Sequence, residues 1–189
     1  MRRMLLLLPA LVILLAGCGG GGSREKQAFL ALRTRWLEAR EVSLHAELRA
    51  DYGERVYDYT LLYTGDEETG LLQVEAPKLI EGVEVLLDAG RVTLRCQDTL
   101  LDTGAVAGRY SPLQALPLQL HAWRKASVLD CWRESRDGAD CLVADLDLTG
   151  AGEAETLRCR AWFDAESGEP RFSELSVDGR TTVSCRFFA

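Results

Sequence analysis

Polar and apolar residues alternate along most of the chain after residue 41. In the segment 42–52, VSLHAELRADY, every even position is apolar or aromatic and every odd position is polar or charged. Because successive side chains of a β-strand point to opposite faces of a sheet, this pattern predicts a strand with one covered face and one solvated face. Similar segments predict further strands in the first half of the chain at 55–65, 69–77, 82–88, 91–97 and about 100–103.

The second half of the chain shows the same kind of pattern between short turn signals. Turn-forming residues gather at 136–138, 150–152 and 167–168, and the pair Asp178-Gly179 is a strong signal for a two-residue β-hairpin. The segments between these turns predict strands at 127–134, 140–149, 155–164, 171–178 and 180–188. The chain is therefore expected to form about eleven strands, connected mostly as consecutive antiparallel hairpins.

Two segments have the apolar spacing of helices instead. Residues 24–41 are expected to form an amphipathic helix capped by Ser23, with an apolar side made of Phe29, Leu32, Trp36 and Leu37. In residues 111–126, Pro117 is expected to separate a first turn from a short helix that starts at the proline, with an apolar stripe of Leu113, Leu116, Leu120 and Trp123. The predicted fold class is mainly β, with one N-terminal helix, a short helical insert and a curved antiparallel sheet around the helices.

The start of the chain has the pattern of a secretory signal peptide. Arg2 and Arg3 precede an apolar run, residues 4–17, whose length as a helix is about 21 Å. This run is too short to span a hydrocarbon core of about 30 Å. The sequence therefore predicts a signal peptide at 1–17 that is removed during secretion.

The last residues of this segment, Leu15-Ala16-Gly17-Cys18, resemble the bacterial lipobox. The resemblance implies that Cys18 becomes the first residue of the mature chain and carries lipid chains. The glycine-rich residues 18–23 are then expected to form a tether, in which the five residues after Cys18 span at most about 18 Å. A single domain at 24–189 should remain close to the extracytoplasmic face of the cell membrane, or of the outer membrane in a Gram-negative source.

Net charge argues against several kinds of partner. The chain has 22 basic and 29 acidic residues, and loss of Arg2 and Arg3 lowers its net charge from −7 to about −9. Such a charge disfavours nucleic acid and a bare anionic lipid surface as partners of the whole domain. The chain contains no G-x-S-x-G, C-x-x-C or H-x-x-x-H pattern, and its four consecutive glycines precede every predicted strand. We therefore expect no enzyme activity, no metal site and no cofactor.

Five further cysteines follow Cys18. Outside the cytoplasm a disulfide is expected, and Cys131 and Cys141 lie nearly opposite each other across a predicted hairpin turn centred near residue 136. The alternation places Cys96, Cys159 and Cys185 on covered faces of their strands. The open alternative is that all five are small, buried, unpaired apolar residues.

Residues 24–188 together resemble the bacterial lipoprotein carrier fold of LolA and LolB, which clostridial germination lipoproteins share. The resemblance rests on the order of elements, on Leu72, Val74, Pro77 and Gly82 in LLQVEAPKLIEG, and on Ser111-Pro112 in the helical insert. It implies an unclosed, eleven-stranded barrel whose concave apolar face holds acyl chains under a helical lid. The residues expected at this cavity are Leu44, Leu48, Tyr59, Leu61, Leu116, Leu120, Trp123, Leu142 and Leu146.

Two functional interpretations follow. In the first, the protein is an anchored binder of lipid or acylated protein, closer to the tethered acceptor LolB than to the soluble shuttle LolA. In the second, the side chains of the concave face fill the interior, and the domain is an anchored interaction module. Its outer face or its sheet edges would then bind another envelope protein, such as a cell-wall hydrolase. A purely structural envelope lipoprotein is a third alternative.

Overall fold

The computed structural model describes residues 21–66, 69–88, 91–97, 99–104, 112–150 and 154–188, with the backbone alone for residues 21–23 and 101–104. Within these residues the chain forms two helices and eleven strands. The helices are α2 (Gly21–Glu38) and α3 (Pro112–Lys125). The strands are β1 (Val42–Asp51), β2 (Val56–Gly65), β3 (Thr69–Ala76), β4 (Glu84–Asp88), β5 (Arg91–Cys96), β6 (Thr99–Gly104), β7 (Ser127–Arg136), β8 (Ala139–Asp147), β9 (Leu157–Asp164), β10 (Pro170–Val177) and β11 (Arg180–Phe188).

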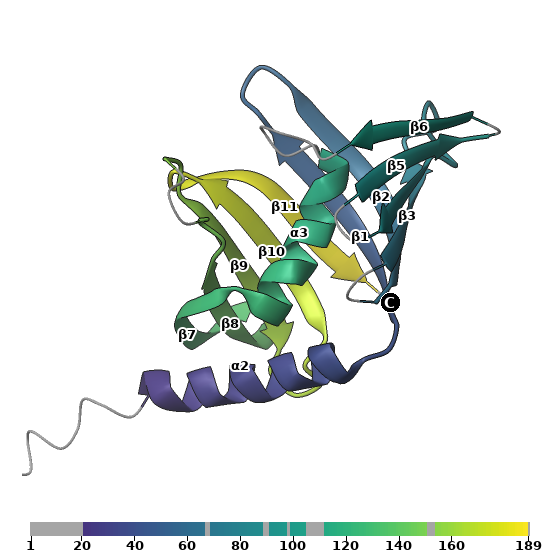
Figure 1. Ribbon diagram of the computed structural model, residues 1–189. Helices are drawn as coiled ribbons and strands as arrows, with labels where there is room; N and C mark the ends of the chain where they lie inside the picture. The colour runs from purple at the N-terminus through teal and green to yellow at the C-terminus, as the bar shows by residue number, and fades with distance from the viewer. Residues whose placement is uncertain are drawn as a thin grey trace, which may run out of the picture.

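All eleven strands belong to one antiparallel sheet in the order β6-β5-β4-β3-β2-β1-β11-β10-β9-β8-β7. Each half of the sheet is a run of neighbouring hairpins, and the pairing of β1 with β11 joins the two halves. The sheet bends strongly and does not close, because β6 and β7 remain at its two edges (Figure 1). The predicted fold class, an unclosed eleven-stranded barrel around helices, is confirmed.

The tight turns follow from residues that tolerate a left-handed backbone. Asp178 and Gly179 join β10 to β11 with φ values of 49° and 79°, and Asp137 and Gly138 join β7 to β8 with φ values of 51° and 79°. Positive φ at both central residues is the conformation that matches the twist of a two-residue hairpin. The hairpin predicted at residues 178–179 is thus confirmed.

Both helices differ in extent from their predictions. Helix α2 begins at Gly21, so residues 21–23 of the expected tether are helical and Ser23 lies inside the helix rather than at its cap. Helix α3 is one continuous element from Pro112 and contains Pro117. A proline inside a helix costs about 3 kcal/mol. The burial of Leu116, Leu120 and Trp123 on both sides of Pro117 offsets this cost.

The helices cover the concave side of the sheet. Helix α3 packs across the inner faces of β1 and β8–β11, whereas α2 packs on β7, β8 and α3 (Figure 1). Phe29 and Leu32 of α2 and the inward residues of both sheet halves form one continuous apolar core. A second, smaller cluster on the outer face consists of Cys141, Val143 and Trp162.

Candidate functional site

The structure brings the nine residues predicted at the cavity together. They come from β1, β2, β8 and α3, and all belong to the main core or pack directly against it. Eight are buried, with at most 8 % of their surface exposed, and Tyr59 is half-buried. At these eight positions side chains pack against each other. An acyl chain would therefore have to enter where the inner face is less completely covered.

Trp123 is the centre of the packed region. Its indole ring makes edge-on contacts with Trp36 at 5.3 Å, Phe163 at 5.2 Å and Phe187 at 5.3 Å between ring centroids. These rings belong to α2, β9 and β11, so one side chain of α3 ties the helix to three other elements. Aromatic contacts of this geometry add to the stabilisation from burial.

Polar contacts fix the last turn of α3. Arg33 of α2 donates hydrogen bonds of 2.8 Å each to the carbonyl oxygens of Trp123 and Ala126. Arg124, which is buried, donates to the carbonyl oxygen of Asp66 at 2.7 Å. Deeper inside, Ser173 donates to the side-chain oxygen of Gln119. These contacts hold the C-terminal part of α3 against α2, β10 and the turn after β2.

The inner face is only partly covered at its other end. Tyr52, Tyr57 and Tyr59 lie near the turn between β1 and β2, where the rings of Tyr57 and Tyr59 stack 6.3 Å apart and Tyr52 meets Tyr57 at 6.2 Å. Partial burial raises the pKa of Tyr52 and Tyr59, so both hydroxyls stay protonated at neutral pH. Half-buried aliphatic side chains extend this surface: Ile80, Val83, Leu94 and Leu113. We call these seven residues the open end.

Burial along β2 shows the gradient between the two ends. The inward residues change from half-buried Tyr57 and Tyr59 to Leu61 at 0 % and Tyr63 at 4 % exposure. The first turns of α3 lie over the same region through Leu113. Because proline has no amide hydrogen, Pro117 cannot bond to the carbonyl of Leu113, so fewer hydrogen bonds hold this end of α3.

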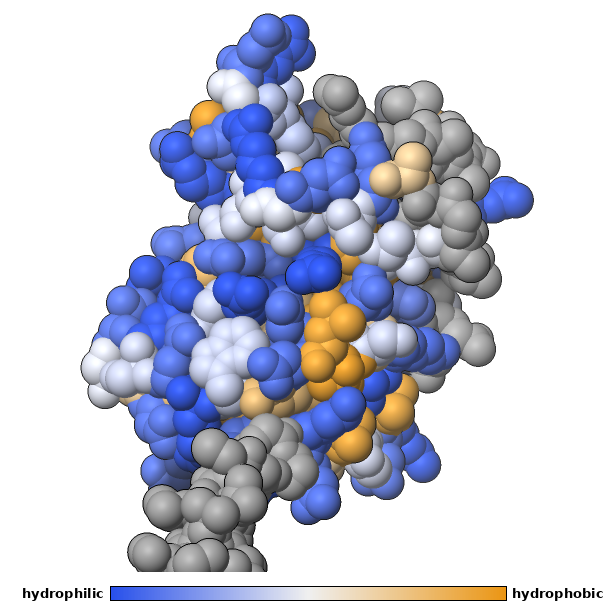
Figure 2. Space-filling view, turned by 90° about the vertical axis from the view of Figure 1, so that its left-hand side faces the viewer, coloured by the Kyte–Doolittle hydropathy of each residue, from blue (hydrophilic) through white to orange (hydrophobic). Residues whose placement is uncertain are grey.

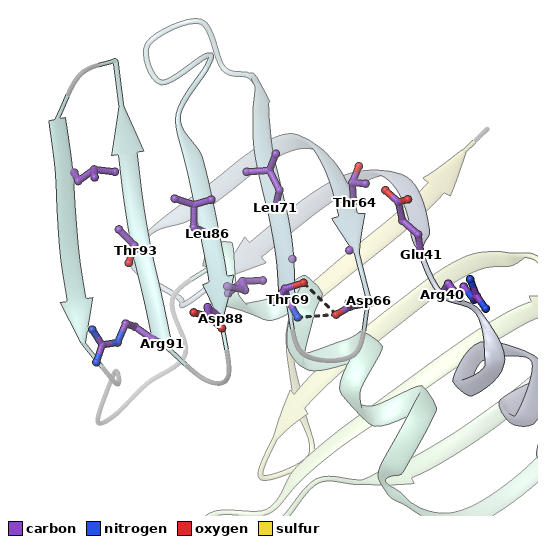
Figure 3. Close-up of a pocket in the computed structure, with 14 residues that line it drawn as sticks. Arg40, Glu41, Thr64, Asp66, Thr69, Leu71, Leu86, Asp88, Arg91 and Thr93 are labelled. Atoms are coloured by element: carbon purple, nitrogen blue, oxygen red, sulfur yellow. Dashed lines mark hydrogen bonds between the residues drawn. The ribbon is translucent and has the colours of Figure 1, made fainter.

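A groove of about 680 Å³ lies on the opposite, outer face of the sheet, and the sequence analysis missed it. Leu71 and Leu86 are directly paired on its floor, and charged residues such as Asp88 and Arg91 stand at its rim (Figure 3). The available signal was the leucine pairs 71–72 and 86–87, because two apolar neighbours on a strand place one side chain on each face.

The expected disulfide between Cys131 and Cys141 is not formed, and both thiols are free. The turn is centred between residues 137 and 138 rather than near 136, so Cys131 pairs with Ala144 and Cys141 with Glu134. Cys131 consequently joins the main core, whereas Cys141 joins the outer cluster. The two thiols lie on opposite faces of the sheet.

The other cysteines follow their predictions in part. Cys159 and Cys185 are fully buried, as expected, and burial raises the pKa of both thiols, for Cys185 to about 12. Cys96 was expected on a covered face but is exposed, because it ends β5 beyond the region that the helices cover. Cys18, the predicted lipidation site, lies outside the described residues.

The described part of the chain contains no group of three His, Cys, Asp or Glu residues arranged to hold a metal ion. His45 and His121 stand apart: His45 lies on the outer face of β1, 3.6 Å from Glu75, and His121 is exposed on α3. Neither described helix has both the length and the hydropathy needed to cross a membrane.

Comparison with solved structures agrees with the fold described above. A DUF1329 family protein from Desulfovibrio piger is similar with a TM-score of 0.52 and 11 % identity, over 90 % of this chain and 92 % of that one. An outer-membrane lipoprotein-sorting protein domain from Vibrio parahaemolyticus gives 0.49 and 13 %, over 81 % and 72 % of the two chains. A LolA superfamily protein from Nitrosomonas europaea gives 0.42 and 10 %, over 86 % and 91 %. No protein-family model and no curated protein matches the chain.

Proposed function

We propose that this protein is an extracytoplasmic lipoprotein, anchored through Cys18, that binds an acyl chain of a lipid or an acylated protein at its open end. The observation that carries the proposal is the half-covered apolar surface that continues directly from the packed core. The tyrosine rings and aliphatic side chains of that surface suit a flexible hydrocarbon chain. Ligand sites of this kind are concave and mostly apolar.

The packed end of the inner face gives the site its depth limit. Leu61, Leu72 and Val74 are fully buried, with at most 1 % exposure, so a chain that enters past Tyr59 meets a filled interior. Further entry requires the first turns of α3 to move away from the sheet. The missing hydrogen bond at Pro117 favours movement there over movement of the last turn, which Arg33 and Arg124 hold.

A titration of the purified protein with a fluorescent fatty acid tests this proposal. Replacing both Tyr57 and Tyr59 by serine removes the stacked pair and should weaken binding at least about tenfold, which corresponds to about 1.4 kcal/mol. Val56 lies on the same strand and is exposed, so Val56→Ser is the matched control and should bind like the parent protein. Equal affinity of the double variant and the control would refute the open end as the binding site.

The outer groove supports a second candidate function, an anchored module that binds another envelope protein. Its paired leucines are apolar side chains on the solvent-facing side of the sheet, close to the edge strand β6. The two functions separate experimentally. Replacing Leu71 and Leu86 by glutamate should abolish partner binding and leave the fatty-acid titration unchanged if the groove is a docking site. Partner binding that survives this change would exclude the groove.

A further inference from the structure

The outward side of α2 is an exposed surface with apolar positions on it. Leu30 and Leu37 are seven residues apart, so they lie on the same side of the helix, about 10 Å from each other along its axis. They are 42 % and 44 % exposed, whereas Phe29 and Leu32 on the inward side are buried. Figure 1 shows α2 lying across one end of the molecule, along its lower edge.

Beside the N-terminal half of α2 the apolar surface extends onto β7. Lys26 reaches the carbonyl oxygen of Val128 at 3.5 Å, and the next residue of β7, Leu129, is 44 % exposed. Figure 2 views the molecule from this side and shows a compact group of hydrophobic side chains within a largely hydrophilic surface. Contiguous exposed apolar groups of this kind mark surfaces that contact a membrane or a protein.

The local charge of α2 is opposite to that of the whole chain. Residues 24–40 contain five basic and two acidic residues, in a chain whose net charge is −7. Arg33 points inward to α3, which leaves Arg24, Lys26, Arg35 and Arg40. Arg35 contacts the turn that carries Glu166 and Glu169, so the cations free to meet an anionic surface lie mainly in the N-terminal half of α2. The argument against an anionic lipid surface holds for the domain as a whole but not for this helix.

The length of chain before α2 limits where the helix can be. Only three peptide steps separate Cys18 from Gly21, the first residue of α2. Three steps span at most about 11 Å. If lipid chains on Cys18 enter the bilayer, the N-terminus of α2 lies at the membrane surface.

We propose that the outward side of α2, with Leu30 and Leu37, docks flat on a bilayer that contains anionic lipid, which turns the open end away from that bilayer. This inference rests on the proposed anchor at Cys18. Amphipathic helices bind at membrane interfaces by burying apolar side chains and by attracting anionic headgroups.

The orientation follows from the direction of β1. This strand starts four residues after α2 ends, and Tyr57 of the open end pairs with Ala50, eight residues farther along β1 than Val42. Eight residues of strand span about 26 Å. The open end is then exposed to the extracytoplasmic space, so the acyl chain it takes must be presented by another protein rather than drawn directly from the anchoring bilayer.

The test uses the full chain, lipidated in cells and reconstituted into vesicles of phosphatidylglycerol and phosphatidylcholine. An environment-sensitive fluorophore is attached at Leu37→Cys in a Cys96→Ser background, which removes the exposed native thiol. The matched control is Leu79→Cys, an exposed leucine between β3 and β4, on the same end of the sheet as the open end. The Leu37 label should shift to shorter wavelength and be quenched by doxyl-labelled lipid, and the Leu79 label should show neither effect.

Two charge variants sharpen the result. Arg24→Glu combined with Lys26→Glu should reduce the quenching at position 37, whereas Lys78→Glu should leave it unchanged. A protein that floats with the vesicles while its Leu37 label stays as unquenched as the Leu79 label overturns the docking inference and leaves the anchor intact. Quenching at both positions overturns the orientation. Failure to float overturns the anchor itself, and with it the inference.

Discussion

Replacement of Trp123 by alanine measures how completely α3 and the sheet fill the interior. The side chain is 1 % exposed and contacts three aromatic rings from three other elements. Truncation of a buried tryptophan costs about 3–5 kcal/mol, through lost apolar burial and the cavity that remains. Because Trp123 is fully buried and has three aromatic partners, we expect a loss near the upper end, about 4–5 kcal/mol. That is a large fraction of a typical stability of about 5–15 kcal/mol.

Urea unfolding followed by far-UV circular dichroism is the appropriate assay, since the loss of one of four tryptophans would complicate fluorescence. The control is Leu129→Ala, a change at an exposed apolar site on β7, which should cost less than about 0.5 kcal/mol. Equal slopes against urea are needed for the comparison of the midpoints to report stability alone. A loss below about 1 kcal/mol for Trp123→Ala would refute the packed interior, because Trp123 would then line a space that its removal barely changes.

Two further predictions concern the cysteines. In the native protein at pH 8, a thiol reagent should modify Cys96 rapidly and leave Cys131, Cys141, Cys159 and Cys185 protected, since burial raises the pKa of these four thiols; rapid reaction of all five would contradict the burial described here. Cys18→Ala should abolish incorporation of radiolabelled palmitate and release the protein from the lipid-anchored membrane fraction after detergent phase partition, whereas Cys96→Ser should behave like the parent protein; undiminished palmitate in the Cys18 variant would exclude Cys18 as the lipidation site.

The sheet could be predicted from the sequence because its signals are local. Alternation in β1 places Leu44 and Leu48 inward, and Asp178-Gly179 specifies a tight hairpin whatever surrounds it. Strand order depends on contacts between distant segments. The pairing of β1 with β11, which joins the two halves, has no signature in either strand alone.

The errors arose where tertiary packing or register decides. Pro117 favours a helix start, but burial on both sides of it keeps α3 continuous. A shift of the β7–β8 turn by less than two residues changed the partner of Cys131 and placed the two expected disulfide partners on opposite faces.

The candidate site was predicted in composition but not in its state of packing. The nine residues expected on the concave face do meet there, since strand parity and helix periodicity fix the direction of each side chain. Whether those side chains leave room depends on how far the sheet bends and how deeply α3 lies against it. For that reason the sequence did not separate the packed residues around Trp123 from the open end around Tyr57 and Tyr59.

Native mass spectrometry of the protein, extracted gently from membranes, tests the central claim most directly. The account predicts one bound acyl-bearing molecule per chain, in addition to the covalent anchor, in the parent protein and in the Val56→Ser control. The Tyr57→Ser, Tyr59→Ser double variant should lose this molecule while it keeps the anchor. A parent protein that carries its anchor alone, or a double variant that retains the extra mass, would contradict an acyl site at the open end.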